Sequence, residues 1–354
     1  MDILAMYADS QPGAAALHAA GRTISFKELN ELANRVGNAL RSLGAGIGDK
    51  VCSVGYNAPE HFVVNSAVTK IAATSVPMNY RLKPPEIAYQ IDNSDTVVQF
   101  AGPEHVAWVE EARKDAPNLR HVVCWGVASP PDGWLRIEDL IADSSPDPIE
   151  LPEGATSGTM LYTAGTTGQP KGAYRRSGLQ AGGGSSGGLN VFGLKPQTPH
   201  LLAGPYYHSA PYAFSNLNLL LGGSVVVMPR FDPEEALQAI DTHKVTWTFM
   251  APTLLTRIVN LPEETKARYD VSSMTTIIVA AAPCPFELKR RVMELFGPSL
   301  FEFYGASETG MNTFITPEEH ARKPGSCGKV VEGQEIKIRD DEGNECESGV
   351  PGEI

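Results

Sequence analysis

Two hydrophobic patterns alternate along the chain: apolar residues at helical spacing, and short continuous apolar runs. Ser25 precedes an apolar stripe at helical spacing, formed by Leu29, Leu32, Ala33, Val36, Ala39 and Leu40. This pattern predicts an amphipathic helix that Ser25 caps, with Glu28 completing a capping box and Gly44 ending the helix. Continuous apolar runs, such as residues 51–54, predict buried strands between such helices.

The same alternation continues over most of the chain. Further strands are predicted at 73–79, 96–100, 121–124, 224–228, 245–250 and 276–280, and helices at 59–70, 233–242 and 285–296. Strands that alternate with helices favour parallel sheets covered by helices on both faces. Residues 129–153 are rich in Pro and Asp and are predicted to form a surface connection. Residues 334–339 alternate at period two before a turn at 341–344, which predicts the start of a small antiparallel barrel.

Composition narrows the class of protein. The chain has 354 residues, ordinary apolar and charged fractions and a net charge of -12. It has no run of Lys and Arg, so a nucleic-acid surface is not expected. The five cysteines are widely spaced without a Cys-x-x-Cys pair, which favours reduced thiols and a cytoplasmic location. No apolar run is long enough to span a bilayer, whereas peripheral membrane contact and a homodimer both remain open.

The most specific chemical signal is the segment at 161–172. Its sequence after the apolar run Met160-Leu161-Tyr162 is Thr163, Ala164, Gly165, Thr166, Thr167, Gly168, Gln169, Pro170, Lys171 and Gly172. Glycines let backbone N–H groups converge on an anion, while hydroxyls and a lysine add donors and charge. A plain surface turn would explain the glycines and the proline but not the threonines and the lysine. The segment is not a Walker A loop, because Pro170 precedes the lysine and Gly172 follows it.

The segment resembles the phosphate loop of adenylate-forming enzymes, a superfamily that includes acyl- and aryl-CoA synthetases, luciferases and adenylation domains of peptide synthetases. Ala164 stands where the family usually has Ser. The resemblance covers essentially the whole chain and includes residues 23–40, residues 70–82 and the final 351–354. It implies an α/β fold of two packed αβ subdomains with largely parallel sheets, at about 1–170 and 171–310, plus an incomplete antiparallel β-barrel at 311–354. It also implies that a C-terminal lid domain, with a lysine that acts in adenylation, belongs to the family enzyme and is missing from these residues.

Three further segments match family motifs. Tyr304, Gly305, Ser307 and Glu308 resemble the Tyr-Gly-x-Thr-Glu motif, which implies that Tyr304 stacks on adenine and that Glu308 holds Mg²⁺. Mg²⁺ prefers oxygen ligands, in keeping with a carboxylate there. Ala281, Ala282 and Pro283 follow a predicted strand, where ligands sit in parallel sheets, and resemble the adenine wall. His208 resembles the histidine that borders the acid pocket, although a lone histidine among apolar residues is more often part of a core.

The resemblance implies an AMP-forming ligase that converts ATP and a carboxylic acid, expected to be a fatty acid, to acyl-AMP and pyrophosphate and then transfers the acyl group to CoA. Lys171, Glu308 and His208 are the expected catalytic residues, and residues 163–168 are expected to bind the phosphates. The alternatives are a different acceptor, such as a carrier protein, and a nucleotide-binding protein without catalysis. A serine hydrolase is a third: Gly183 to Gly187 matches Gly-x-Ser-x-Gly around Ser185, but lacks the preceding apolar strand that a nucleophile elbow needs.

Overall fold

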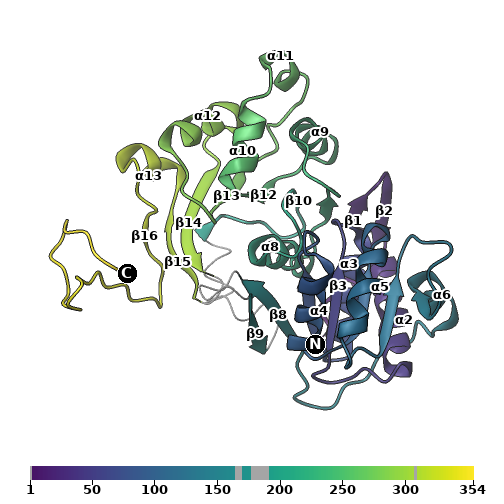
Figure 1. Cartoon of the computed structure of the whole chain (residues 1–354). Coiled ribbons are helices and arrows are strands. Elements are labelled where there is room, and N and C mark those ends of the chain that lie inside the picture. The colour runs from purple at the N-terminus through teal and green to yellow at the C-terminus, as the bar shows by residue number, and fades with distance from the viewer. Residues whose placement is uncertain (1, 164–169, 177–190, 307–308) are drawn as a thin grey trace.

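Two mainly parallel sheets organise the chain in a computed structural model that describes residues 2–163, 170–176, 191–306 and 309–354 (Figure 1). The first sheet has the order β7-β6-β5-β3-β4-β8-β9. Its strands are β3 (Lys50–Val54), β4 (Thr74–Met78), β5 (Thr96–Ala101), β6 (His121–Cys124), β7 (Trp134–Arg136), β8 (Gly158–Thr163) and β9 (Lys171–Arg176). All neighbours in it are parallel except the antiparallel pair β8 and β9.

The second sheet has the order β16-β15-β14-β13-β12-β10-β11-β1-β2. Its strands are β1 (Ala15–Ala19), β2 (Arg22–Ser25), β10 (His200–Leu202), β11 (Val225–Val227), β12 (Trp247–Met250), β13 (Thr276–Val279), β14 (Leu300–Ala306), β15 (Gly310–Ile315) and β16 (Lys329–Val330). It is parallel from β14 to β1 and has antiparallel strands at both ends. The expected α/β class with two largely parallel sheets is therefore confirmed.

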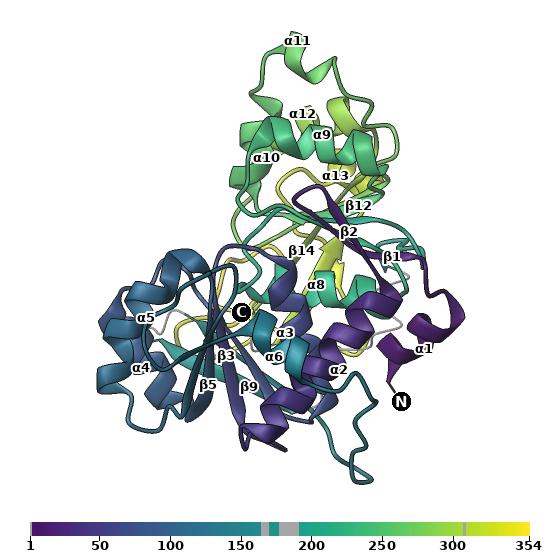
Figure 2. The same ribbon diagram turned by 90° about the vertical axis from the view of Figure 1, so that its right-hand side faces the viewer.

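Helices cover both sheets. Those from the first half of the chain are α1 (Ile3–Ser10), α2 (Phe26–Ser42), α3 (Pro59–Lys70), α4 (Pro84–Asn93), α5 (Val106–Ala112) and α6 (Ile137–Asp143). Those from the second half are α8 (Ser209–Leu220), α9 (Pro233–His243), α10 (Pro252–Val259), α11 (Glu263–Lys266), α12 (Phe286–Phe296) and α13 (Pro317–Arg322). Figure 2 shows that α9, α10 and α12 gather at one end of the molecule, away from α4 and α5.

Local signals determine several helix boundaries as predicted. The Ser25 hydroxyl accepts the backbone N–H of Glu28 at 3.2 Å and caps α2, and Gly44 follows the helix with a positive φ of 80°. The predicted capping box is not formed, because the Glu28 carboxylate forms an ion pair with Arg22 on β2 instead. Helix α3 occupies the predicted range 59–70, with Pro59 in its first turn.

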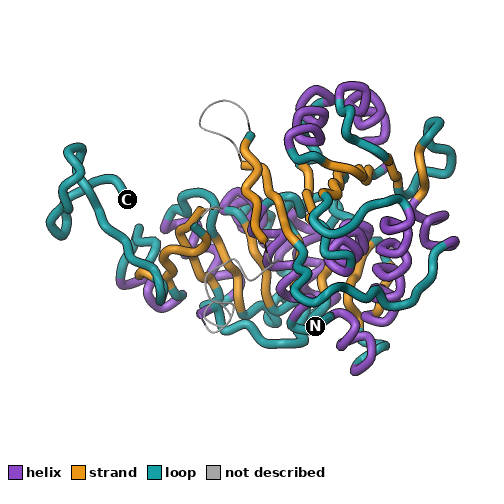
Figure 3. Tube along the Cα trace, turned by 90° about the horizontal axis from the view of Figure 1, so that it is seen from below, coloured by secondary structure: helices purple, strands orange, loops and turns teal. Residues whose placement is uncertain are grey.

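Two predictions about irregular segments need correction. The surface connection at 129–153 contains β7 and α6, because Trp134 and Ile137 are buried and anchor the segment to the first sheet. Residues 334–339 do not form a strand; only Arg339 makes isolated antiparallel bridges, with Glu345 and Glu353. The predicted turn is present, since Gly343 N–H donates to Asp340 O at 3.0 Å. In the segment predicted to start a barrel, β15 pairs with β16, and only these bridges follow, while Figure 3 shows the end of the chain extending as loop away from the sheets.

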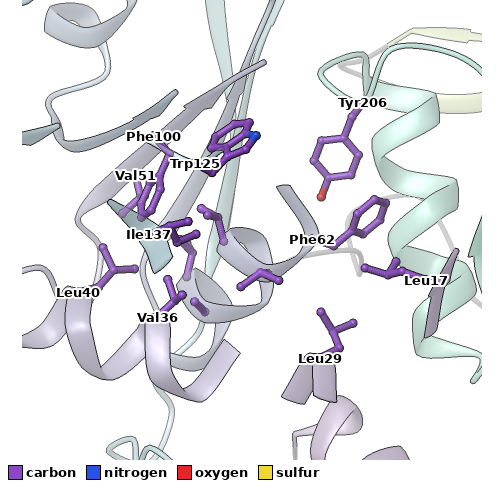
Figure 4. Packing of buried hydrophobic residues seen from close by; sticks show 14 of the residues in the cluster. Leu17, Leu29, Val36, Leu40, Val51, Phe62, Phe100, Trp125, Ile137 and Tyr206 are labelled. Carbon is purple, nitrogen blue, oxygen red and sulfur yellow. The ribbon is translucent and has the colours of Figure 1, made fainter. Parts of the chain in front are cut away.

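One hydrophobic cluster contains buried residues from both sheets. Phe62 on α3 packs against Tyr206, which follows β10, with ring centroids 4.9 Å apart, and both side chains are buried (Figure 4). Leu17 on β1 belongs to the same cluster. Full burial of a side chain such as Phe62 contributes about 1.5–3 kcal/mol. Strands β1 and β2 come from the start of the chain but lie in the second sheet. The two sheets therefore do not divide the chain at residue 170, and the subdomain boundaries at 170 and 310 stay a prediction.

Candidate nucleotide site

Three predicted site segments leave the carboxyl ends of parallel strands in the second sheet. The loop before His208 follows β10, the segment Ala281–Pro283 follows β13, and Tyr304 lies near the end of β14. Val279 on β13 is level with Glu302 on β14, so Ala281 and Tyr304 each follow this pair by two residues along their segments. Ligands of open parallel sheets bind at this end of the strands.

The backbone of Ala281 has a left-handed conformation with a φ of 75°. Residues other than Gly, Asn and Asp rarely adopt it, because for an L-residue it costs about 1–2 kcal/mol. Ala281 is exposed, as are Ala282 and Pro283, so the segment presents its backbone and small side chains to the surface. Strained residues of this kind gather at ligand sites. Ala281 therefore turns the chain sharply out of β13 before α12 begins at Phe286.

Tyr304 and Gly305 lie inside the hairpin that β14 and β15 form. Strand β14 continues to Ala306 and pairs with β15, with a register shift between Tyr304 and Gly305. A Cβ on Gly305 would meet the carbonyl oxygen of Gly310 at 1.9 Å, so this position requires glycine. Tyr304 is 41% exposed, which leaves its ring accessible to a planar ligand. Ser307 and Glu308 are outside the described residues.

His208 stands at the N-terminus of α8 and contacts the first half of the chain. Its ring lies 4.2 Å from that of Tyr207, which packs edge-on against Tyr80 at 5.4 Å. Burial, followed by the positive charge of Arg81, lowers the pKa of His208. The imidazole is therefore neutral at neutral pH and can accept or donate a hydrogen bond without carrying charge.

The predicted phosphate loop joins the two strands of the β8–β9 hairpin. Thr163 and Lys171 face each other as the last pair of that ladder, and Lys171 is exposed. The hydroxyl of Tyr89 on α4 donates to Pro170 O at 3.1 Å and holds one side of the connection. Ala164, Gly165, Thr166, Thr167 and Gly168 lie outside the described residues, as does Ser185. Figure 3 shows the hairpin extending beyond its sheet.

A buried polar network that the sequence did not predict connects this hairpin to α8. Tyr212 O–H lies 3.3 Å from Thr159 Oγ1 on β8 and donates to Asn65 Oδ1 on α3 at 2.6 Å. Asn65 Nδ2 donates to Asn216 Oδ1 at 2.9 Å. The network thus joins β8, which leads to the phosphate loop, to the helix that begins after His208. Asparagines on otherwise apolar helix faces were the available signal, because buried polar groups need partners.

The described residues contain no group of three or more His, Cys, Asp or Glu side chains that could hold a metal ion. Mg²⁺ does not require such a group, because it commonly binds through one or two carboxylates together with phosphate oxygens and water. Glu308, the carboxylate predicted to hold Mg²⁺, lies outside the described residues. In the described part of the chain, no helix combines the length and apolarity that crossing a bilayer requires.

Comparison with known proteins identifies the family. A family model described as AMP-binding enzyme matches residues 4–354. The chain belongs to the AMP-binding enzyme family. Its resemblance to the adenylate-forming superfamily is thereby confirmed.

Individual members are similar along nearly the whole chain. An indoleacetate–CoA ligase of Aromatoleum aromaticum is 30% identical, with 98% of this chain matching 68% of that protein. A feruloyl-CoA synthase of Amycolatopsis is 31% identical, with 97% of this chain matching 66% of its length. The crystal structure of the anthranilate CoA ligase AuaEII with anthranoyl-AMP is 27% identical with a TM-score of 0.87, covering 99% of this chain and 67% of that one. The chain thus spans about two thirds of these relatives.

Proposed function

We propose that the protein carrying this chain is an AMP-forming carboxylic acid–CoA ligase. It would join a carboxylic acid to ATP, giving acyl-AMP and pyrophosphate, and then transfer the acyl group to CoA. The observation that carries the proposal is the family match over residues 4–354. Relatives named as ligases of indoleacetate, ferulate and long-chain fatty acids support CoA as the acceptor.

The residues of this chain would act mainly by position and charge. Thr163, Lys171 and the intervening loop would hold the β- and γ-phosphates, while Ala281–Pro283 and Tyr304 would enclose the adenine ring. Fixing the carboxylate in line with the α-phosphorus removes much of the entropic barrier. Mg²⁺ on Glu308 would neutralise charge on the departing pyrophosphate. Lys171 is not part of any ion pair in the described part of the chain, so its charge is available to an anion.

We expect a carboxylic acid without an amino group as the substrate, because the segment around His208 lacks the Asp that adenylation domains of peptide synthetases use to hold an amino group. Neutral His208 would border the acid at the start of α8 and donate a hydrogen bond to the carboxylate without forming an ion pair that holds the substrate too tightly in its ground state. We expect the substrate to be a fatty acid. We also predict that the protein is cytoplasmic and forms a homodimer. The unpaired state of all five cysteines is compatible with a reducing compartment.

One assay separates the main alternatives. The complete protein should exchange labelled pyrophosphate into ATP only when a suitable acid from a panel is present. A nucleotide-binding protein without catalysis, or a serine hydrolase using Ser185, would show no such exchange. Release of AMP should then accelerate on addition of CoA.

A carrier protein is the second candidate acceptor. A fatty acid–[acyl-carrier-protein] ligase of Streptomyces coeruleorubidus is 26% identical over 98% of this chain. Acid-dependent exchange without acceleration by CoA, but with loading of an acyl carrier protein, would favour that reaction.

A further inference from the structure

A buried ion pair lies behind the candidate adenine site. Lys289 on α12 donates from Nζ to Oε2 of Glu302 on β14, and the two side chains are only 2% and 10% exposed. Removing two charges from water costs several kcal/mol for each ion, and a well-packed apolar pair is often as stable or more stable. Packing alone therefore does not account for charges at these positions.

The pair joins the two segments that would enclose adenine. Lys289 lies in the first turns of α12, where its backbone N–H donates to Pro285 O at 3.1 Å, directly after Ala281–Pro283. Glu302 precedes Tyr304 by two residues on β14. Side chains two apart on a strand share one face, so Tyr304 emerges on the face where Glu302 meets α12.

The neighbouring titratable side chains are neutral, so Lys289 and Glu302 neutralise each other. His320 on α13 is buried, and burial, followed by the charge of Lys289, lowers its pKa to about 4. His320 is therefore neutral near pH 7. Cys284 is also neutral, because burial and then Glu302 raise its pKa to about 11. In the described part of the chain, Lys289 forms no second ion pair.

We propose that Lys289 and Glu302 are positioning residues that fix the spacing between Ala281–Pro283 and Tyr304 and thereby set the affinity for the adenine ring. The inference rests on the proposed function, because it assumes that the nucleotide base lies between these segments. An ion pair with defined donors and acceptors holds one separation, whereas apolar contacts allow neighbouring elements to slide.

The test uses Lys289→Met in the complete protein, with Lys70→Met as the matched control. Lys70 is 7% exposed at its side chain and pairs with Asp2, and its Nζ donates to Asn30 Oδ1 at 2.7 Å, far from the site in sequence and fold. Calorimetry would measure the Kd values of AMP and of pyrophosphate, and thermal unfolding would measure Tm. Both variants should lower Tm, but only Lys289→Met should raise the Kd of AMP, by about tenfold, with pyrophosphate binding unchanged.

Glu302→Gln provides a second variant that keeps the side-chain volume and an acceptor for Lys289, and it should weaken AMP binding in the same direction. AMP binding equal to wild type in the folded variants, despite a lowered Tm, would overturn the positioning role. Tyr304→Ala distinguishes this failure from failure of the proposed site. If Tyr304→Ala leaves AMP binding unchanged, adenine binds elsewhere, and the site assignment fails together with the inference.

Discussion

Two antiparallel hairpins carry the predicted nucleotide motifs, and they differ in how the fold supports them. The β8–β9 hairpin lies at the edge of its sheet, and β9 has no buried residue among the six that form it. The β14–β15 hairpin lies inside its sheet, because β14 pairs with β13 in parallel and β15 pairs with β16. The comparison indicates that β9, on the predicted phosphate side, lies at a sheet edge without buried residues, whereas β14, on the predicted adenine side, is anchored by buried Leu300 and Glu302.

The motif glycines give the sharpest test of this difference. A Cβ on Gly305 would overlap the backbone of Gly310, whereas a Cβ on Gly172 would meet the flexible end of Met160 at 2.1 Å. We expect Gly305→Ala to lower the free energy of unfolding by about 3 kcal/mol or more, since backbone must move. Gly172→Ala should cost less than about 1.5 kcal/mol, because Met160 can change rotamer.

Urea unfolding of both variants, compared with wild type, would measure these free energies. Equal losses in the two variants would remove the distinction between an edge hairpin and an embedded one.

The second prediction concerns the charge on the edge hairpin. Lys171→Ala should slow acid-dependent pyrophosphate exchange by about 100-fold, because it removes one positioned charge from the phosphates. Stability should change little, since Lys171 is exposed. Arg176→Ala on the same strand serves as a control for loss of positive charge on β9. Unchanged exchange in Lys171→Ala would mean that the hairpin does not hold the phosphates.

The third prediction uses pH to probe the support of the embedded hairpin. The pKa of buried His320 is about 4 in the folded chain, below its usual value near 6.5. The unfolded chain therefore binds a proton that the folded chain does not, and stability falls as pH decreases from about 6.5 to about 4. One such proton gives a slope of about 1.4 kcal/mol per pH unit.

The variant His320→Gln should remove that part of the slope, which urea unfolding at several pH values would measure. The prediction would be wrong if the free energy of unfolding of His320→Gln and of wild type changed equally with pH.

The smallest expected effect concerns Ala281. Replacing it by glycine relieves the left-handed strain but adds freedom to the unfolded chain, so Ala281→Gly should stabilise the protein by about 0.5–1 kcal/mol. Ala282→Gly is the adjacent control and should not stabilise it. A loss of stability in Ala281→Gly would show that the strain at this turn is already compensated by its neighbours.

The sequence by itself determined the class of fold and the chemical motifs. Periodicity predicted the helix that follows Ser25, which is α2, because amphipathic spacing and capping are local properties. The lysine and threonines at 163–171 indicated a phosphate loop for the same reason: the required donors are adjacent in the chain. The resemblance to adenylate-forming enzymes followed from these residues and is confirmed by the family match.

Tertiary structure alone decided which distant segments meet. The pairing of β1 with β11, the Tyr212 network and the Lys289–Glu302 pair all join residues whose sequence gives no sign of each other. The period-two pattern at 334–339 predicted a strand that the structure does not form. A strand needs a neighbouring strand and a covered apolar face, and the described residues supply only isolated bridges there. Local patterns fix what each segment can become, whereas burial and pairing between segments decide what it becomes.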